Sequence, residues 1–278
     1  MEDIRISAVI FHSIVGRINQ NLARTAFWVK AAKKRGADIV CFPELNITGY
    51  SNHQEIVTLA QSIPGAVTDK LSSMASDAGI IILAGMAEKD QNGCIYASHL
   101  VIMPKGDIGV YRKLYLAPPE QAIFTHGKRP VVFETRGLRF GIQLCYDAHF
   151  PEVSTLMADA GAEVIFIPHA SPRGAAPDKH KSWMRHLPAR AYDNGVFIVA
   201  TNQVGENADG LTFPGNSVVF SPSGEILDKK LKGKEELLTV DLKAQQIEYV
   251  RSHRMRYFFP NRRPELALEQ IKTEHLFY

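Results

Sequence analysis

The sequence places a cysteine where a predicted strand gives way to a helix. Cys145 follows the segment Leu138 to Leu144, whose alternating apolar residues are typical of a buried strand. Beyond it, Pro151 and Glu152 suit the first turn of a helix, where proline fits and a carboxylate is favoured. At such a turn a thiol projects to the surface, and backbone N–H groups and the helix dipole favour its thiolate. Cys145 is therefore a candidate nucleophile, although most cysteines near strand ends are simply small buried side chains.

Two ionisable side chains occupy comparable places at the ends of other predicted strands. Glu44 follows the apolar strand Ile39 to Phe42, where burial would raise the pKa of its carboxyl group and suit it to act as a general base. Lys113 follows the strand Ile108 to Arg112, where a partly buried ammonium could hold a thiolate ionised and stabilise an oxyanion. Taken alone, each of these two side chains could be an ordinary charged group on the surface. Together with Cys145 they predict covalent catalysis by a thiol.

Three segments carrying these residues resemble the signatures of the nitrilase, or carbon–nitrogen hydrolase, superfamily in its amidase-like branch. The likeness extends over nearly the whole chain, and three ordered motifs with matching flanks are specific. The motifs are Phe42-Pro43-Glu44, Tyr111-Arg112-Lys113 and Cys145-Tyr146-Asp147 with Phe150-Pro151-Glu152, and the likeness continues through 187–194, 202–205, 215–217 and 221–226.

Strands and helices alternate along the chain, which predicts a layered α/β fold. The resemblance sharpens this to a four-layer α-β-β-α sandwich with two central mixed sheets. It implies one domain over residues 1–278, with 245–278 a tail that either joins a subunit interface or packs on its own subunit. The expected helices are Ile18 to Lys34, Ala66 to Ala78, Val153 to Ala160 and one within Lys179 to Asp193; the expected strands include Ile4 to Phe11, Ile80 to Ala87, Ile95 to Met103, Val164 to Pro168, Val196 to Thr201, Ser217 to Ser221 and Leu237 to Val240.

The resemblance implies hydrolysis of a small amide to the carboxylate and ammonia through a cysteine thioester, with no cofactor. Cys145 would attack the carbonyl carbon, and Glu44 would move the protons. Lys113, with the backbone N–H of Tyr146, would stabilise the oxyanion. Glu120 lies in the loop where related enzymes carry a second acid, and a surface position fits it equally well.

Several other side chains belong to segments expected near these groups. The candidate substrate-binding residues are Tyr50, Tyr115, Tyr146, His149, His169 and Arg173. Arg173 could bind a substrate carboxylate, and His169 suits contact with substrate better than proton transfer. For Phe124 and Trp183, in the same segments, core packing is at least as good an interpretation.

The residues after Cys145 narrow the substrate class. Tyr146 and Asp147 stand where true nitrilases usually have Trp-Glu, which favours amides over nitriles. D-carbamoylases usually have arginines at the positions of Ala148 and His149, so this departure lowers the case for N-carbamoyl-D-amino acids. An N-carbamoyl amine or amino acid is therefore the second candidate substrate, after a small amide. Two alternatives from other classes are a catalytically silent binding protein on the same fold and a glutaminase subunit of a larger synthetase.

Composition argues against other functions. The chain of 278 residues has a formal net charge of +3 and no basic stretch interleaved with aromatic residues, which disfavours nucleic-acid binding. Its longest apolar runs are too short to cross a bilayer. His180 and His186 are six residues apart, off the spacing of a helical metal site, so no metal is expected.

The odd number of cysteines gives no disulfide framework, and because Met1-Glu2-Asp3 lead directly into the first expected strand, no signal peptide is expected. A reducing cytoplasm is therefore the expected location, and the resemblance implies a homodimer or higher homo-oligomer.

Overall fold

The first sheet joins five strands from the amino-terminal half of the chain to one from near its end. This computed structural model describes residues 1–135 and 137–267. The strand order is β14-β1-β2-β3-β4-β5. Its strands are β1 (Ile4–Ile10), β2 (Ile39–Cys41), β3 (Ile81–Lys89), β4 (Ile95–Ile102), β5 (Ile108–Arg112) and β14 (Glu236–Leu242). β1, β2 and β3 pair in parallel, whereas β3, β4 and β5 form antiparallel hairpins. The turn at Gln91-Asn92-Gly93 joins β3 to β4.

The second sheet has the order β13-β12-β9-β8-β7-β6, with a parallel centre of β7, β8 and β9. A separate two-stranded ribbon, β10 (Val204–Glu206) with β11 (Thr212–Pro214), follows β9. The sheet strands are β6 (Val132–Thr135), β7 (Leu138–Ile142), β8 (Val164–His169), β9 (Phe197–Asn202), β12 (Ser217–Phe220) and β13 (Ile226–Lys230).

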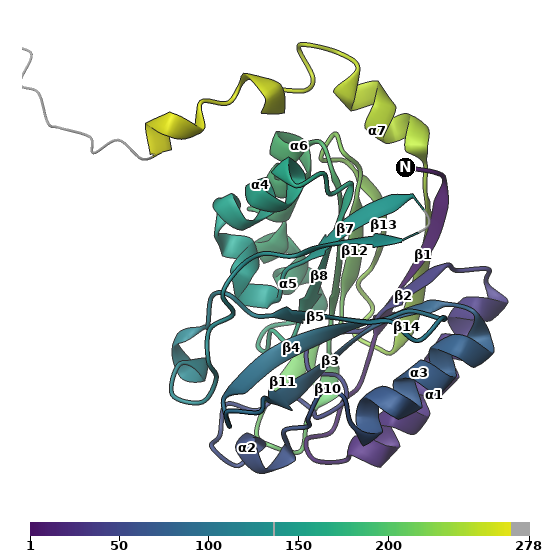
Figure 1. Ribbon diagram of the computed structural model, residues 1–278, viewed down its shortest axis with the longest axis vertical. Helices are drawn as coiled ribbons and strands as arrows, with labels where there is room; N and C mark the ends of the chain where they lie inside the picture. The colour runs from purple at the N-terminus through teal and green to yellow at the C-terminus, as the bar shows by residue number, and fades with distance from the viewer. Residues whose placement is uncertain (136, 268–278) are drawn as a thin grey trace, which may run out of the picture.

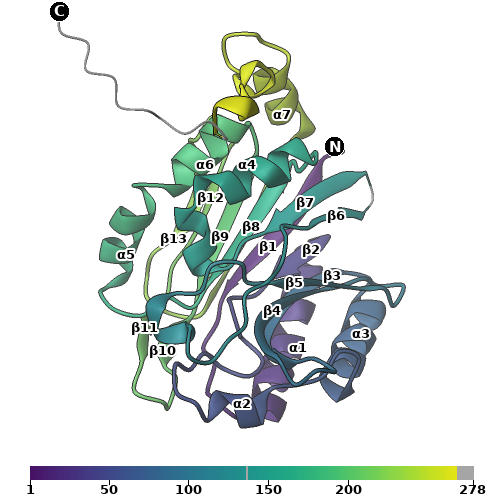
Figure 2. The same cartoon turned by 60° about the vertical axis from the view of Figure 1, so that its left-hand side comes forward.

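Helices cover the outer faces of the two sheets, as Figures 1 and 2 show. α1 (Ile18–Lys34) and α3 (Ala66–Ala78) lie side by side on the first sheet, and α4 (Pro151–Asp159), α5 (Ala176–Trp183) and α6 (Leu187–Asn194) lie beside the second. The short α2 (Ile56–Leu59) follows β2, and α7 (Ala244–Arg251) follows β14. Single 3₁₀ turns span Pro118–Glu120, Cys145–His149, Phe259–Asn261 and Pro264–Ala267.

Side-chain alternation along the strands divides the core between these layers. In β2, Ile39 and Cys41 belong to the apolar cluster shared with the second sheet, whereas Val40 between them packs with Leu22 and Leu71 of the outer helices. This is the two-residue period of a strand buried on both faces. The observed layers confirm the predicted α/β fold with two central mixed sheets.

Two regions differ from the sequence expectations. The segment predicted to contain one helix, within Lys179 to Asp193, contains the end of α5 and all but the last residue of α6, because Pro188 suits only the first turn of a helix and α6 begins at Leu187. Strands β6, β10, β11 and β13 were not expected. They are short or half-exposed, so their apolar pattern is weak.

The described part of the carboxyl-terminal tail packs on its own chain. The Arg251 guanidinium donates to the carbonyls of Ala162 and Gly195, and the Phe258 ring lies 5.4 Å from that of Tyr192. Residues 268–278 of the predicted tail lie outside the described residues.

The topology brings the ends of four strands to one place. β5 is related to β3 by two antiparallel steps, so it runs in the same direction as β2 and β3. The carboxyl ends of β2 and β5 therefore share one edge of the first sheet, and those of β7 and β8 share one edge of the second. A hydrogen bond of 3.0 Å from the Ala170 backbone N–H, just after β8, to Glu44, just after β2, joins the two edges. Such edges are where open α/β sheets bind ligands.

Candidate active site

Glu44 is a fully buried carboxylate at the end of the first sheet. Its Oε1 accepts a hydrogen bond of 2.7 Å from Lys113, and its Oε2 accepts one of 3.0 Å from the Ala170 N–H. The backbone carbonyl of Glu44 accepts a bond of 2.7 Å from the Gln203 side chain, which fixes the turn carrying it. Burial raises the pKa of Glu44 to about 7, offset in part by the Lys113 charge and reinforced by the Glu120 charge.

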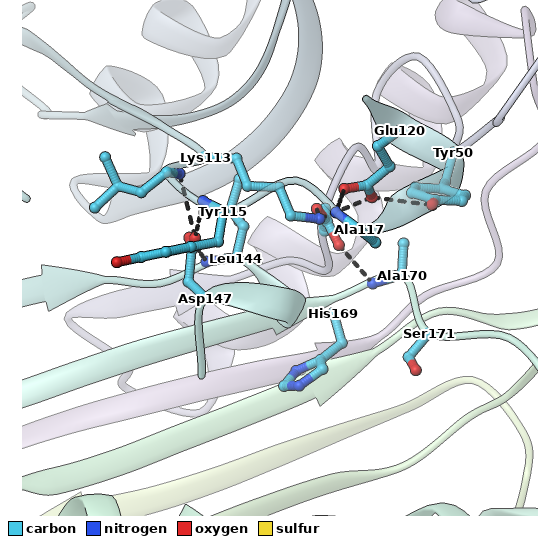
Figure 3. A network of polar contacts seen from close by, with 12 residues as sticks. Tyr50, Lys113, Tyr115, Ala117, Glu120, Leu144, Asp147, His169, Ala170 and Ser171 are labelled. Carbon is cyan, nitrogen blue, oxygen red and sulfur yellow. Dashed lines mark hydrogen bonds and ion pairs between the residues drawn. The ribbon is translucent and has the colours of Figure 1, made fainter. Parts of the chain in front are cut away.

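Lys113 lies between two carboxylates with almost no exposure to solvent. Its Nζ is 2.7 Å from Glu44 Oε1 and 2.8 Å from Glu120 Oε1 (Figure 3). Burial alone would lower the pKa of this ammonium, but the two carboxylates hold it well above its usual value. An ammonium has three donors, and these two bonds use two of them.

The sequence allowed two interpretations of Glu120, a second catalytic acid or a surface residue. In the structure Glu120 is a buried member of this network. Its Oε1 also accepts a bond of 2.9 Å from the Tyr50 hydroxyl, and its Oε2 accepts one of 2.8 Å from the Ala117 N–H. Because Tyr50, Lys113 and Ala117 all donate to it, Glu120 is held firmly against the lysine (Figure 3).

Cys145 stands at the predicted sharp turn, three residues beyond Ile142, the last residue of β7. Its φ of 40° lies in the left-handed region, which costs a residue with a Cβ about 1–3 kcal/mol. A 3₁₀ turn, Cys145–His149, intervenes before α4 begins at Pro151. The residue is only partly exposed.

The expectation that the turn favours a thiolate is wrong for this resting structure. Burial raises the pKa of the Cys145 thiol to about 12, and the charges of Glu44 and Glu120 act in the same direction. Lys113 and Lys179 oppose them without overcoming the burial. The thiol is therefore protonated near neutral pH, and a nucleophilic role requires a base within the site.

Asp147 joins the cysteine turn to the loop after Lys113, a role the sequence did not reveal. Its fully buried carboxylate accepts bonds of 2.9 Å from the Leu144 N–H, 2.7 Å from the Tyr115 N–H and 2.8 Å from the Tyr111 hydroxyl. The Leu114 N–H adds a longer bond of 3.2 Å. An acidic residue three positions after Leu144 is a capping pattern, and that local signal could have suggested the first of these bonds.

Among the predicted substrate-binding residues, the three tyrosines have separate surroundings. Tyr50 is buried and donates to Glu120. Tyr115 stacks on Phe150 with ring centroids 3.7 Å apart, and its hydroxyl donates to Glu152. Tyr146 is partly exposed, with its ring 5.5 Å from that of Phe150. The structure therefore brings Tyr50 into the charged network and leaves Tyr115 and Tyr146 beside the cysteine turn.

The other three predicted substrate-binding residues, His169, His149 and Arg173, differ in how far they are buried. His169 is buried, shares a hydrogen bond of 2.8 Å with the carbonyl of Ile167, and lies 4.4 Å from the Trp183 ring. Burial holds the pKa of His169 well below its usual value, so it is neutral. His149 is exposed, with its ring 4.6 Å from that of His186. Arg173 is exposed.

Phe124 and Trp183, for which the sequence also allowed core packing, both belong to buried apolar clusters. Lys179 was missed altogether: it lies on α5, and its charge acts on the Cys145 thiol. No local pattern marks it, because the position depends on how α5 packs.

The described residues give no sign of a metal centre or a membrane span. Within residues 1–135 and 137–267, no group of three or more His, Cys, Asp or Glu is arranged to hold a metal ion. In that same part of the chain, no helix combines the length and apolar character needed to cross a bilayer.

The chain is similar in sequence to one protein family and to proteins named as a nitrilase and an amidase. The family model described as carbon-nitrogen hydrolase matches residues 7–252. A protein named nitrilase from Pyrococcus abyssi is 33% identical over 266 residues, covering 94% of this chain and 98% of that protein. An (R)-stereoselective amidase from a Pseudomonas species is 32% identical over 256 residues, covering 92% of this chain and 89% of that protein.

The fold is also similar to that of solved amidase structures. A variant of an amidase from Nesterenkonia sp. AN1 superposes with a TM-score of 0.82 at 25% identity, covering 95% of this chain and 96% of that one. Its structure is described as showing covalent addition of the acetamide moiety of fluoroacetamide at the active-site cysteine.

Proposed function

The chain belongs to the carbon–nitrogen hydrolase family of nitrilase-like amidases, and from that premise we propose that it hydrolyses a small amide to a carboxylate and ammonia through a thioester on Cys145. The observation that carries the proposal is the network of Glu44, Lys113 and Glu120, buried at the strand ends within electrostatic reach of the thiol. The adduct described at the cysteine of the Nesterenkonia amidase supports a cysteine nucleophile.

In the first half of the reaction, Glu44 takes the thiol proton while the sulfur attacks the carbonyl carbon of the amide. A base is needed because the thiol is protonated at neutral pH, and a carboxylate with a pKa of about 7 is well matched to both accept and return a proton. Collapse of the tetrahedral intermediate breaks the carbon–nitrogen bond, and Glu44 returns the proton to the departing nitrogen. The products of this half are ammonia and the Cys145 thioester.

Lys113 and the Tyr146 N–H stabilise the negative oxygen of the tetrahedral intermediate. Two donors of the Lys113 ammonium are held by Glu44 and Glu120, which leaves the third for that oxygen. One such donor is worth about 3–4 kcal/mol of transition-state stabilisation. Glu120 and Tyr50 support the reaction by holding the lysine in place.

In the second half, Glu44 takes a proton from water, and the hydroxide equivalent attacks the thioester carbon. Breaking the carbon–sulfur bond releases the carboxylic acid, and the proton returns to the Cys145 sulfur. The enzyme is regenerated with no redox change, so atoms and electrons balance without a cofactor.

The test is ammonia release from a panel of neutral amides, carboxylate-bearing amides, N-carbamoyl compounds and nitriles, measured with the wild type and Cys145→Ala. If the wild type hydrolyses amides and Cys145→Ala does not, the proposal is supported. If turnover is confined to N-carbamoyl compounds or nitriles, that class replaces amides as the substrate. Fluoroacetamide provides an independent readout, because mass spectrometry would locate its adduct on Cys145. A wild type that neither releases ammonia nor forms the adduct would leave the catalytically silent binding protein.

We also infer a homodimer, as family membership implies. Light scattering of the full chain and of a chain ending at Val250 tests it and the contribution of the tail. A monomeric full chain contradicts the dimer, and an unchanged dimer after truncation removes the tail from the interface.

A further inference from the structure

A second lysine lies near the thiol, on the side of the second sheet. Lys179 of α5 is partly buried, and its Nζ donates to Ser171 Oγ at 2.6 Å and to the Pro172 carbonyl at 3.2 Å. Both partners are neutral, and Lys179 forms no ion pair with any residue that the structure describes. In this it differs from Lys113, whose charge two carboxylates balance.

The Lys179 ammonium is tied to the loop that also positions Glu44. The N–H of Ala170 donates to Glu44, and the next residue is Ser171, which accepts from Lys179 (Figure 3 shows this loop). The Ser171 backbone is itself held on both sides by the Asn202 side chain, through two bonds of 3.0 Å. The position of this ammonium relative to the reacting groups is therefore set by packing.

The charges around the thiol are unequally distributed. The Lys179 charge acts on Cys145 and on the nearby His149 and His169, each of which lies on the same side of the site. Burial and the neighbouring Arg173 both lower the pKa of Lys179, and the Cys145 charge opposes them. The site thus contains a cation that forms no direct ion pair with any residue that the structure describes.

We propose that Lys179 binds a carboxylate at the far end of the substrate's acyl chain, so that the preferred substrates are small amides carrying a carboxylate. This inference rests on the proposed amide hydrolysis. Two of the three ammonium donors are used by Ser171 and Pro172, and the third is free for a carboxylate oxygen. The sequence suggested Arg173 for such a contact, but Arg173 is exposed, whereas Lys179 is held in place.

Two amides of equal size separate charge recognition from shape. Succinamate carries a carboxylate, and 4-methylpentanamide has two methyl groups in place of its oxygens. We expect the wild type to prefer succinamate in kcat/KM. Lys179→Met should lower the ratio of the two kcat/KM values by about 10- to 100-fold, the range of one charge-assisted hydrogen bond. Using the ratio cancels any change in Cys145 reactivity, because that change affects both substrates.

Two further variants serve as controls. Lys181→Met removes an exposed charge from the same helix and should leave the ratio at the wild-type value. Lys179→Arg keeps the charge and should restore part of the preference. The preference of the wild type should also weaken as salt is raised, and thermal unfolding checks that each variant is folded.

Each alternative outcome is distinct. Equal losses on both amides after Lys179→Met would leave the ratio unchanged and mean that Lys179 only supports the Ser171 loop, and unchanged kcat/KM values for both amides would mean that it touches no carboxylate. Either result overturns the inference. Wild-type hydrolysis of 4-methylpentanamide tests the proposed function without Lys179, so a wild type that cleaves it at least as well as succinamate keeps that function and overturns only the role of Lys179.

Discussion

The two sides of the site contribute charge in opposite ways. On the first-sheet side, Glu44, Lys113 and Glu120 form a closed network of opposite charges that is almost wholly buried. On the second-sheet side, Cys145 and Lys179 are only partly buried, and the lysine has neutral partners. A buried network of full charges survives only when every charge is paired and hydrogen-bonded, so the first side is rigid and self-sufficient.

This difference separates chemistry from recognition. Proton transfer needs groups whose positions do not depend on the substrate, and the first side supplies them. Recognition of a charged substrate needs a charge that the protein leaves unpaired, and we propose that Lys179 on the second side supplies it. Substitutions on the first side should therefore affect every substrate alike, whereas Lys179 should change the choice among substrates.

The largest effect is expected at the thiol, where the two sides meet. Cys145→Ala should reduce ammonia release by about 10⁴-fold or more, because no covalent intermediate can form. Cys94→Ala is the matched control, since Cys94 is also partly exposed but lies at the β3–β4 hairpin. Residual turnover within tenfold of the wild type would contradict the nucleophile assignment.

The next effect tests the base on the first side. Glu44→Gln should lower kcat by about 10²- to 10⁴-fold for neutral and charged amides alike, because the amide cannot accept the thiol proton. Glu134→Gln, at an exposed glutamate on β6, should leave kcat unchanged. A loss confined to one class of substrate would place Glu44 in recognition and break the division between the two sides.

The pH profile sharpens the same assignment. The Glu44 pKa of about 7 is raised above the usual value, so the carboxyl is protonated and inactive as a base below that pH. The value of kcat/KM should fall about tenfold per pH unit as the pH drops below 7. Residual activity of Glu44→Gln should lack this limb. A wild-type profile that stays flat between pH 7 and 5 would show that no group with this pKa controls the reaction.

A smaller effect is expected where Asp147 holds the two sides together. Asp147→Asn replaces an acceptor oxygen with a donor that faces N–H groups, and should cost about 1.5–3 kcal/mol in the free energy of unfolding. Urea titration measures the cost, and Asp159→Asn, at an exposed aspartate ending α4, is the control. We also expect kcat to fall more than KM rises, because the cysteine turn moves relative to Lys113. An unchanged unfolding midpoint would contradict the positioning role.

The sequence by itself determined most of the scaffold and pointed to the three groups that we propose react. Helices α1 and α3 have the predicted bounds, because their apolar periodicity is long and regular. Glu44, Lys113 and Cys145 were predicted because each follows an apolar strand, which is visible locally, and because their three motifs together resemble one family. The break between α5 and α6 was missed although Pro188 marks it, because the apolar pattern on both sides suggested continuity.

Only the tertiary structure decided how these groups behave. The Ala170 N–H that holds Glu44 comes from 126 residues away, and the Gln203 amide from 159 residues away. Burial of Glu120, the protonated state of the Cys145 thiol and the lack of an ion pair at Lys179 all depend on such distant neighbours. A pKa or an ion pair reflects everything packed around a group, whereas local periodicity records only which face of an element is buried. The sequence therefore indicates the candidate reacting groups, and the packing of the two sheets sets their charges.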